Sequence, residues 1–152
     1  PSSQEEGEMN DLEFMRRALL LAAAGVGQTG DNPSVGCVIV RDGVVIAEAR
    51  TADGGRPHAE EQALALADAR GATAYITLEP CAKRSNGTVS CADRLIQANI
   101  ARVVIGADDP HPFAAGAGVE RLRAAGVRAE TGVLVEEVRA QNADFFARWS
   151  EN

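Results

Sequence analysis

A continuous apolar run over residues 35–40 constrains the fold more than any other feature of the sequence. A run of this length without alternating polar residues is typical of a β-strand that is buried on both faces. Such a strand needs other elements packed on each side of its sheet. The dipeptide Asp42-Gly43 follows and is a strong signal for a tight hairpin turn, so we expect residues 44–49 to form the returning strand.

The rest of the chain alternates between helical and extended patterns. Apolar spacing predicts helices over residues 11–24, 59–69, 92–98, 119–125 and 133–149, and strands over residues 74–78, 102–105 and 127–131. Short helical crossovers join the later strands, which are therefore expected to run parallel. This order of helices and strands along the chain predicts a three-layer α/β/α domain. Functional sites in such sheets gather at the carboxyl ends of strands and the amino ends of helices.

Length, composition and charge narrow the classes of function. The chain has 152 residues, of which 45% are hydrophobic and 24% are charged, as in one ordinary globular domain. We expect the polar, acidic residues 1–9 to form a flexible tail rather than a signal peptide, and residues 10–152 to form the domain. A net charge of −7 disfavours sequence-independent binding of nucleic acid. Three cysteines and no long apolar run predict a cytoplasmic protein without a membrane span.

The strongest chemical signal is His58-Ala59-Glu60, followed by Pro80-Cys81 and then by Cys91. His58, Cys81 and Cys91 each lie at the end of a predicted element, where sites gather. Imidazole nitrogen and thiolate sulfur are zinc ligands, and a set of three leaves the fourth position open, as catalytic zinc sites require. The sequence therefore predicts that these three residues hold one Zn²⁺ per chain.

Glu60 is the predicted catalytic residue. It lies two residues from His58 and can reach the site without being a ligand, so it can take a proton from a zinc-activated water and pass it to a substrate. The same pattern of residues has this role in zinc deaminases. The alternative, a closed structural zinc site, needs a fourth ligand. The chain offers only His111, or Cys37 inside a predicted buried strand.

Several longer motifs accompany these residues. They are Asn32-Pro33-Ser34-Val35-Gly36-Cys37-Val38, His58-Ala59-Glu60, Thr77-Leu78-Glu79-Pro80-Cys81, Ala101-Arg102-Val103-Val104, Asp109-Pro110-His111-Pro112, Gly116-Ala117-Gly118 and Ala125-Gly126-Val127. Through them, residues 10–146 resemble the deaminase domain of the riboflavin-pathway pyrimidine deaminases, within the cytidine deaminase-like superfamily. The long gap between Cys81 and Cys91 separates the chain from cytidine and tRNA deaminases, which use Cys-x-x-Cys.

The resemblance implies a fold, a reaction and partners. It implies a mixed five-stranded sheet with helices on both faces. It implies hydrolytic release of ammonia from a small phosphorylated pyrimidine, a diaminopyrimidinone that carries a ribosylamino 5′-phosphate. It also implies a homodimer or larger homo-oligomer. Because many relatives carry a reductase domain, a separate reductase is an expected partner in the pathway.

The resemblance also locates candidate substrate-binding residues. Asn32 would hydrogen-bond the substrate in the family's pocket, although Asn-Pro is also an ordinary turn pair. In the loop over residues 82–90, Lys83, Arg84, Ser85 and Thr88 are candidates to grip a phosphate, and the alternative is a solvated loop. This loop departs from the family's His-x-Gly-Arg-Thr-Pro-Pro-like sequence and is one residue longer.

The altered loop keeps a second function open. In this alternative, the chain is a zinc deaminase that acts on another nucleobase, nucleoside or amino-heterocycle. A third hypothesis, from another class, is a non-catalytic zinc-stabilised binding module. Glu60 discriminates against it, because a structural site has no use for a carboxylate beside its histidine. We interpret Asp109-Pro110 as a strand-ending turn rather than part of a second metal site, and Phe145 and Phe146 as packing residues.

Overall fold

The computed structural model describes residues 3–82, 89–110 and 115–150. Its helices are α1 (Ser3–Ala23), α2 (Ala59–Leu64), α3 (Cys91–Gln97), α4 (Ala117–Ala124), α5 (Val135–Gln141) and α6 (Ala143–Ser150). Its strands are β1 (Gly36–Arg41), β2 (Val44–Arg50), β3 (Thr73–Leu78), β4 (Arg102–Ala107) and β5 (Arg128–Glu130).

The five strands form one mixed sheet in the order β2-β1-β3-β4-β5. β1 pairs antiparallel with β2 and β3, whereas β3, β4 and β5 run parallel. Asp42 and Gly43, with φ of 53° and 78°, turn the chain between β1 and β2, as the sequence predicts for a hairpin. The predicted mixed sheet with parallel later strands is confirmed.

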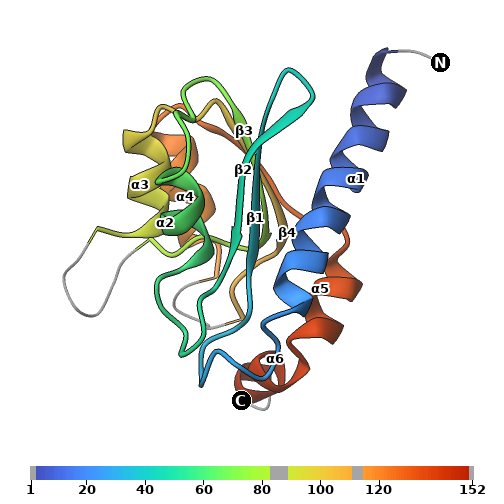
Figure 1. Cartoon of the computed structure of the whole chain (residues 1–152), viewed down its shortest axis with the longest axis vertical. Coiled ribbons are helices and arrows are strands. Elements are labelled where there is room, and N and C mark those ends of the chain that lie inside the picture. The colour runs from blue at the N-terminus through green and yellow to red at the C-terminus, as the bar shows by residue number, and fades with distance from the viewer. Residues whose placement is uncertain (1–2, 83–88, 111–114, 151–152) are drawn as a thin grey trace.

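Helices cover both faces of the sheet and give the predicted three layers. α1 and α5 lie on one face, and α2, α3 and α4 lie on the other (Figure 1). Successive side chains of β1 point to opposite faces. Cys37 and Ile39 pack into the cluster beneath α2 and α3, whereas Val38 and Val40 pack with Met15 of α1. Burial on both faces explains why this strand has an unbroken apolar sequence.

α2 ends earlier than the apolar pattern predicts. It stops at Leu64 rather than continuing to residue 69. The Arg41 guanidinium, at the end of β1, donates hydrogen bonds to the backbone oxygens of Asp68 and Arg70 at 2.6 and 2.7 Å. These long-range bonds hold the following segment in a turn, and they override its alanine-rich helical propensity.

The last predicted helix is broken in two at Asn142. The buried Asn142 side chain accepts a hydrogen bond from the Ser34 N–H and donates one to the Ser34 oxygen, both at 2.9 Å. The Ser34 hydroxyl in turn donates to the Ala22 oxygen at the end of α1. Asn142 therefore ties the junction of α5 and α6 to the segment that enters β1.

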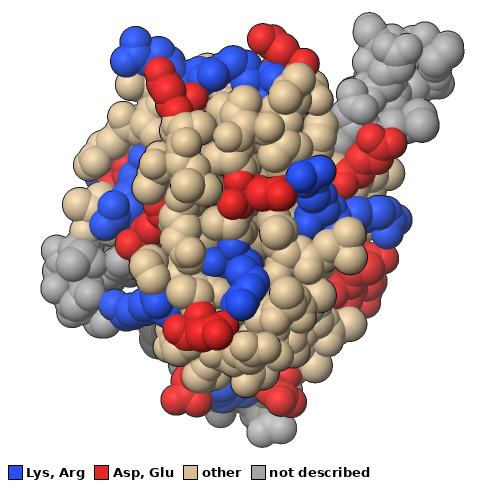
Figure 2. All heavy atoms as spheres, viewed as in Figure 1, with Lys and Arg blue, Asp and Glu red and all other residues tan. Residues whose placement is uncertain are grey.

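The surface carries mixed charge. On the face seen in Figure 2, basic and acidic side chains of the described residues alternate rather than gather into one basic surface. Across the described ranges, no helix is both long and apolar enough to cross a bilayer.

α1 begins at Ser3 rather than near Asp11, so residues 3–9, expected to be a tail, are helical. Asp11 is consequently inside the helix and has a different role. Its carboxylate binds Arg102 at 2.7 Å and accepts a hydrogen bond from the Tyr75 hydroxyl at 2.7 Å. Arg102 also binds Glu130 at 2.9 Å. This network joins α1 to β3, β4 and β5.

We expect this network to make stability depend on pH. Burial alone raises the pKa of Asp11, but hydrogen bonds from Arg102 and Tyr75 bring that pKa below its usual value. Hydrogen bonds from Arg102 also lower the pKa of Glu130. A carboxyl whose folded pKa is depressed stabilises the fold above its unfolded pKa, and that contribution is lost as the pH falls through the folded pKa. The free energy of unfolding should therefore decline as the pH is lowered from about 5 to about 3.

Urea unfolding at a series of pH values measures this effect. An Arg102→Met variant should be less stable at pH 7 and should lose less of its stability between the two pH limits. Arg70→Met, at an exposed position, is the matched control and should follow the wild type. An Arg102→Met variant with the full wild-type pH dependence would contradict the assignment.

Candidate active site

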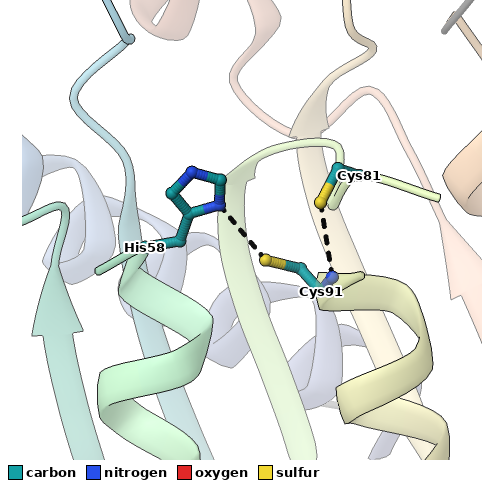
Figure 3. Close-up of side chains that lie close together, drawn as sticks. All are labelled: His58, Cys81 and Cys91. Atoms are coloured by element: carbon teal, nitrogen blue, oxygen red, sulfur yellow. Dashed lines mark hydrogen bonds between the residues drawn. The ribbon is translucent and has the colours of Figure 1, made fainter. Parts of the chain in front are cut away.

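Three potential metal ligands meet at the carboxyl edge of the sheet. His58 is the residue that precedes α2, Cys81 follows β3, and Cys91 is the first residue of α3. Their ligand atoms all lie within 4.8 Å of one another, and their side chains point toward a common centre (Figure 3). Cys91 is buried, and the other two are half-buried.

Local hydrogen bonds fix the two cysteines. Ser90 caps α3, because its hydroxyl oxygen accepts the Asp93 N–H at 3.1 Å. The Cys91 N–H donates to the Cys81 sulfur at 3.3 Å, and the Ala92 N–H donates to the Cys81 oxygen at 3.0 Å. Backbone donors at a helix amino end favour the thiolate form of a nearby cysteine.

Hydrogen bonds to both polar groups fix the peptide bond between Pro57 and His58. Its N–H donates to the Glu61 carboxylate at 3.4 Å, and Gln62 donates from its side chain to the Pro57 oxygen at 2.9 Å. The imidazole Nδ1 then lies 3.3 Å from the Cys91 sulfur (Figure 3). Nδ1 is therefore the ring nitrogen that faces the two cysteines.

The donor set fits zinc. One imidazole nitrogen and two sulfurs are ligands that zinc accepts, and three protein ligands match a catalytic site with one open position. Within the described ranges, these residues are the one group of His, Cys, Asp and Glu side chains placed to hold a metal ion. Cys37 lies apart in β1, where burial raises the pKa of its thiol well above its usual range. It is a buried apolar residue, as the sequence predicts.

His58 and Cys81 border a cavity of about 190 Å³. Its lining residues are Asn32, Pro33, Val35, Thr51, His58, Glu60, Leu78, Glu79, Cys81, Asp109 and Phe145. The structure thus brings Asn32 and Glu60 to the same cavity as two of the potential ligands. The Asn32 amide donates to the Gly55 oxygen at 3.1 Å, which fixes its orientation at the wall.

Glu60 is 4% exposed, and its burial raises the pKa of its carboxyl. A carboxyl with a raised pKa exchanges protons more readily near neutral pH than an exposed one, and this property suits a general base that must later act as an acid. Glu60 lines the cavity together with His58 and Cys81, and its catalytic role stays a prediction.

Glu79, Asp109 and Phe145 line the cavity but are not among the predicted site residues. Glu79 directly precedes the Pro80-Cys81 motif, and that position is the one sequence signal for it. Asp109 follows β4 in the predicted turn, yet it also lines the cavity. Phe145 is expected from the sequence to be a packing residue, and its half-buried ring forms part of the cavity wall.

The candidate phosphate-binding residues Lys83, Arg84, Ser85 and Thr88 lie outside the described residues.

Comparisons with known proteins identify the family. A family model described as the cytidine and deoxycytidylate deaminase zinc-binding region matches residues 8–107. The riboflavin biosynthesis protein RibD of Actinobacillus pleuropneumoniae is 48% identical over 140 residues, which are 91% of this chain and 37% of that protein. The diaminohydroxyphosphoribosylamino-pyrimidine deaminase of Buchnera aphidicola is 42% identical over 142 residues, which are 92% of this chain and 96% of that protein.

This chain belongs to the cytidine and deoxycytidylate deaminase family. A solved structure from Thermotoga maritima, named as a deaminase and a 5-amino-6-(5-phosphoribosylamino)uracil reductase, superposes with a TM-score of 0.87. It is 40% identical, and the match covers 94% of this chain and 42% of that one. The chain thus spans about two fifths of the length of the RibD-type deaminases it matches. The cofactor of this zinc-binding deaminase family is zinc, and His58, Cys81 and Cys91 are positioned to hold it.

We expect one zinc ion per purified chain and a loss of that zinc when a ligand is removed. Cys81→Ala and Cys91→Ala should each lose most bound zinc, because two remaining ligands bind it far more weakly. Both variants should also unfold at a lower temperature than the zinc-loaded wild type. Elemental analysis of the zinc-to-protein ratio and a thermal scan measure these effects.

The third cysteine supplies a matched control. Cys37→Ala makes the same side-chain change at a buried position and should keep the full zinc content. Full zinc content in both Cys81→Ala and Cys91→Ala would exclude a site built from these two residues, whereas equal loss in all three variants would indicate general damage to the fold.

Proposed function

We propose that this chain is the zinc-dependent deaminase of the riboflavin pathway. In this proposal it hydrolyses the ring amino group of the diaminopyrimidinone ribosylamino 5′-phosphate and releases ammonia. The observation that carries the proposal is the buried Glu60 carboxyl, which lines one cavity with His58 and Cys81. The Buchnera relative matches this chain over nearly its whole length and is named for this deaminase activity.

In the proposed mechanism, His58, Cys81 and Cys91 hold the zinc ion. Zinc bound there supplies Lewis acidity, which lowers the pKa of water to about 7. Asn32, at the cavity wall, orients the pyrimidine ring by hydrogen bonding. The apolar wall that includes Phe145 shields the reacting ring from bulk solvent.

Glu60 moves the protons of the reaction. Its carboxylate takes one proton from the attacking water and transfers it to the neighbouring ring nitrogen, while the water oxygen forms a bond to the ring carbon. Glu60 then takes the remaining hydroxyl proton and delivers it to the exocyclic amino group. The carbon–nitrogen bond breaks, ammonia leaves, and the ring carbon becomes a carbonyl. One water is consumed for each ammonia released.

The setting of the reaction is part of the proposal. The thiol ligands need a reducing compartment, which supports a cytoplasmic location. We also propose that the chain forms a homo-oligomer and that a reductase acts next on the product. The Thermotoga protein supports this order, because its name combines a deaminase with a reductase.

Glu60→Gln tests the proposed mechanism. The amide keeps the size of the side chain but cannot accept a proton, so the rate of ammonia release should fall by about a hundredfold to ten-thousandfold. Zinc content should be unchanged, because Glu60 is not a ligand. A coupled ammonia assay with the diaminopyrimidinone phosphate measures the rate. Glu136→Gln, the same change at an exposed position on α5, should keep the wild-type rate.

Comparison substrates separate the competing functions. Cytidine and guanine should react far more slowly than the pyrimidine phosphate. Turnover of another amino-heterocycle alone would retain the mechanism and replace the substrate. If the zinc-loaded wild type and Glu60→Gln were equally inert on every aminopyrimidine, the non-catalytic binding module would be the better description.

A further inference from the structure

Glu79 is a buried carboxylate that the proposed proton transfers do not use. It lies directly after β3, is 5% exposed, and lines the same cavity as Glu60. Its own N–H donates to the Ala107 oxygen at 2.9 Å, which continues the pairing of β3 with β4 beyond the strand end. A buried carboxylate requires compensation, so the partners of its two oxygens identify its role.

Three backbone N–H groups supply that compensation. The N–H groups of Asp109 and Gly116 both donate to Oε1 of Glu79 at 3.0 Å. The N–H of Val119, in the first turn of α4, donates to Oε2 at 3.1 Å. Glu79 therefore binds the chain where it leaves β4 and again where it enters α4. These three contacts lie 30 to 40 residues from Glu79 in the sequence.

The three backbone donors favour a carboxylate, rather than an amide, at position 79. Both oxygens of a carboxylate only accept hydrogen bonds, and bonds to an ionised acceptor are stronger than neutral ones. A glutamine at this position has one accepting oxygen and one donating NH₂ group. Its NH₂ group would face at least one of the three backbone N–H donors, which would lose its acceptor.

Close backbone packing accompanies these hydrogen bonds. A Cβ atom on Gly118 would lie 2.0 Å from the Pro80 oxygen and 3.2 Å from Cγ of Glu79. Glycine therefore lets the first turn of α4 lie directly against the residues that precede Cys81. The two segments meet through backbone atoms and the Glu79 carboxylate, so Glu79 couples the β4–α4 connection to the wall that contains Cys81.

We propose that Glu79 is a positioning residue that sets the substrate-binding wall formed by Asp109. The carboxylate fixes the backbone N–H of Asp109, and Asp109 lines the same cavity as the residues that carry out the chemistry. Glu79 thereby controls how well the cavity fits its substrate, whereas His58, Cys81 and Glu60 control the reaction. This inference rests on the proposed deaminase activity.

Two variants test the proposal by steady-state kinetics. Glu79→Gln keeps the shape of the side chain and removes accepting capacity, and Glu79→Asp keeps the charge on a shorter side chain. Glu79→Gln should raise KM for the pyrimidine phosphate by about tenfold or more and change kcat by less than about threefold. Glu79→Asp should give a smaller rise in KM. Both should keep one zinc per chain. Glu120→Gln, exposed on α4, is the control and should match the wild type.

Amide hydrogen exchange gives a second readout that does not depend on activity. The backbone N–H groups of Asp109, Gly116 and Val119 should exchange faster in Glu79→Gln, while the amides of β3 remain protected. If Glu79→Gln fails to fold, Glu79→Asp decides by the same measurements.

The outcomes separate the two proposals. Unchanged KM together with unchanged exchange at the three amides would overturn the role of Glu79. A parallel loss of zinc, kcat and stability would overturn it as well, because that result describes general structural damage. An inert wild type would overturn the proposed function, and faster exchange at the three amides would then still establish that Glu79 holds the β4–α4 connection.

Discussion

The parallel pairing of β3 with β4 determines the geometry of the site. A parallel pair needs a crossover, so the chain leaves the sheet after β3 and returns through α3 before β4 begins. Cys81 marks the departure and Cys91 begins the crossover helix. The Cys91 N–H donates a hydrogen bond to the Cys81 sulfur, which holds the start of α3 beside the residue that follows β3. His58, at the start of α2, reaches the same edge because α2 packs beside α3.

The site concentrates negative charge in a small volume and compensates it in several ways. Glu60 is buried, and its raised pKa reflects the cost of that burial. Glu79 is equally buried but is bound by three backbone donors. In the proposed holoenzyme, the two charges of zinc offset the two thiolates. One cavity therefore contains two buried carboxyls with different surroundings, and the one bound by three backbone donors is held in position.

Most of the fold and the group of metal ligands could be predicted from local sequence. The apolar run at residues 35–40, the Asp42-Gly43 turn and the residues His58, Cys81 and Cys91 each depend on near neighbours or on element ends. The early end of α2 and the break at Asn142 could not be predicted in this way. Both depend on hydrogen bonds from distant segments, as Asn142 shows by pairing with a residue 108 positions away.

The same limit applies to the cavity wall. Glu79 and Asp109 lie together because the Asp109 N–H, just after β4, donates to the Glu79 carboxylate, and neither residue carries a periodic pattern that indicates this contact. Phe145 has the apolar character of a core residue, yet it lies in α6, after the break, and it lines the cavity. Local sequence patterns thus predict the residues that carry out the chemistry better than they predict the cavity wall that contacts the substrate.

The bond between Asn142 and Ser34 also has a consequence for biosynthesis. The residues positioned to bind zinc lie between His58 and Cys91, and they can converge once β3 and α3 have left the ribosome. Asn142 and Phe145 emerge later: Asn142 ties the α5–α6 junction to Ser34, and Phe145 forms part of the cavity wall. We therefore expect the nascent chain to acquire its metal while the site is still open on one side, so that cofactor loading precedes the closure of the substrate cavity.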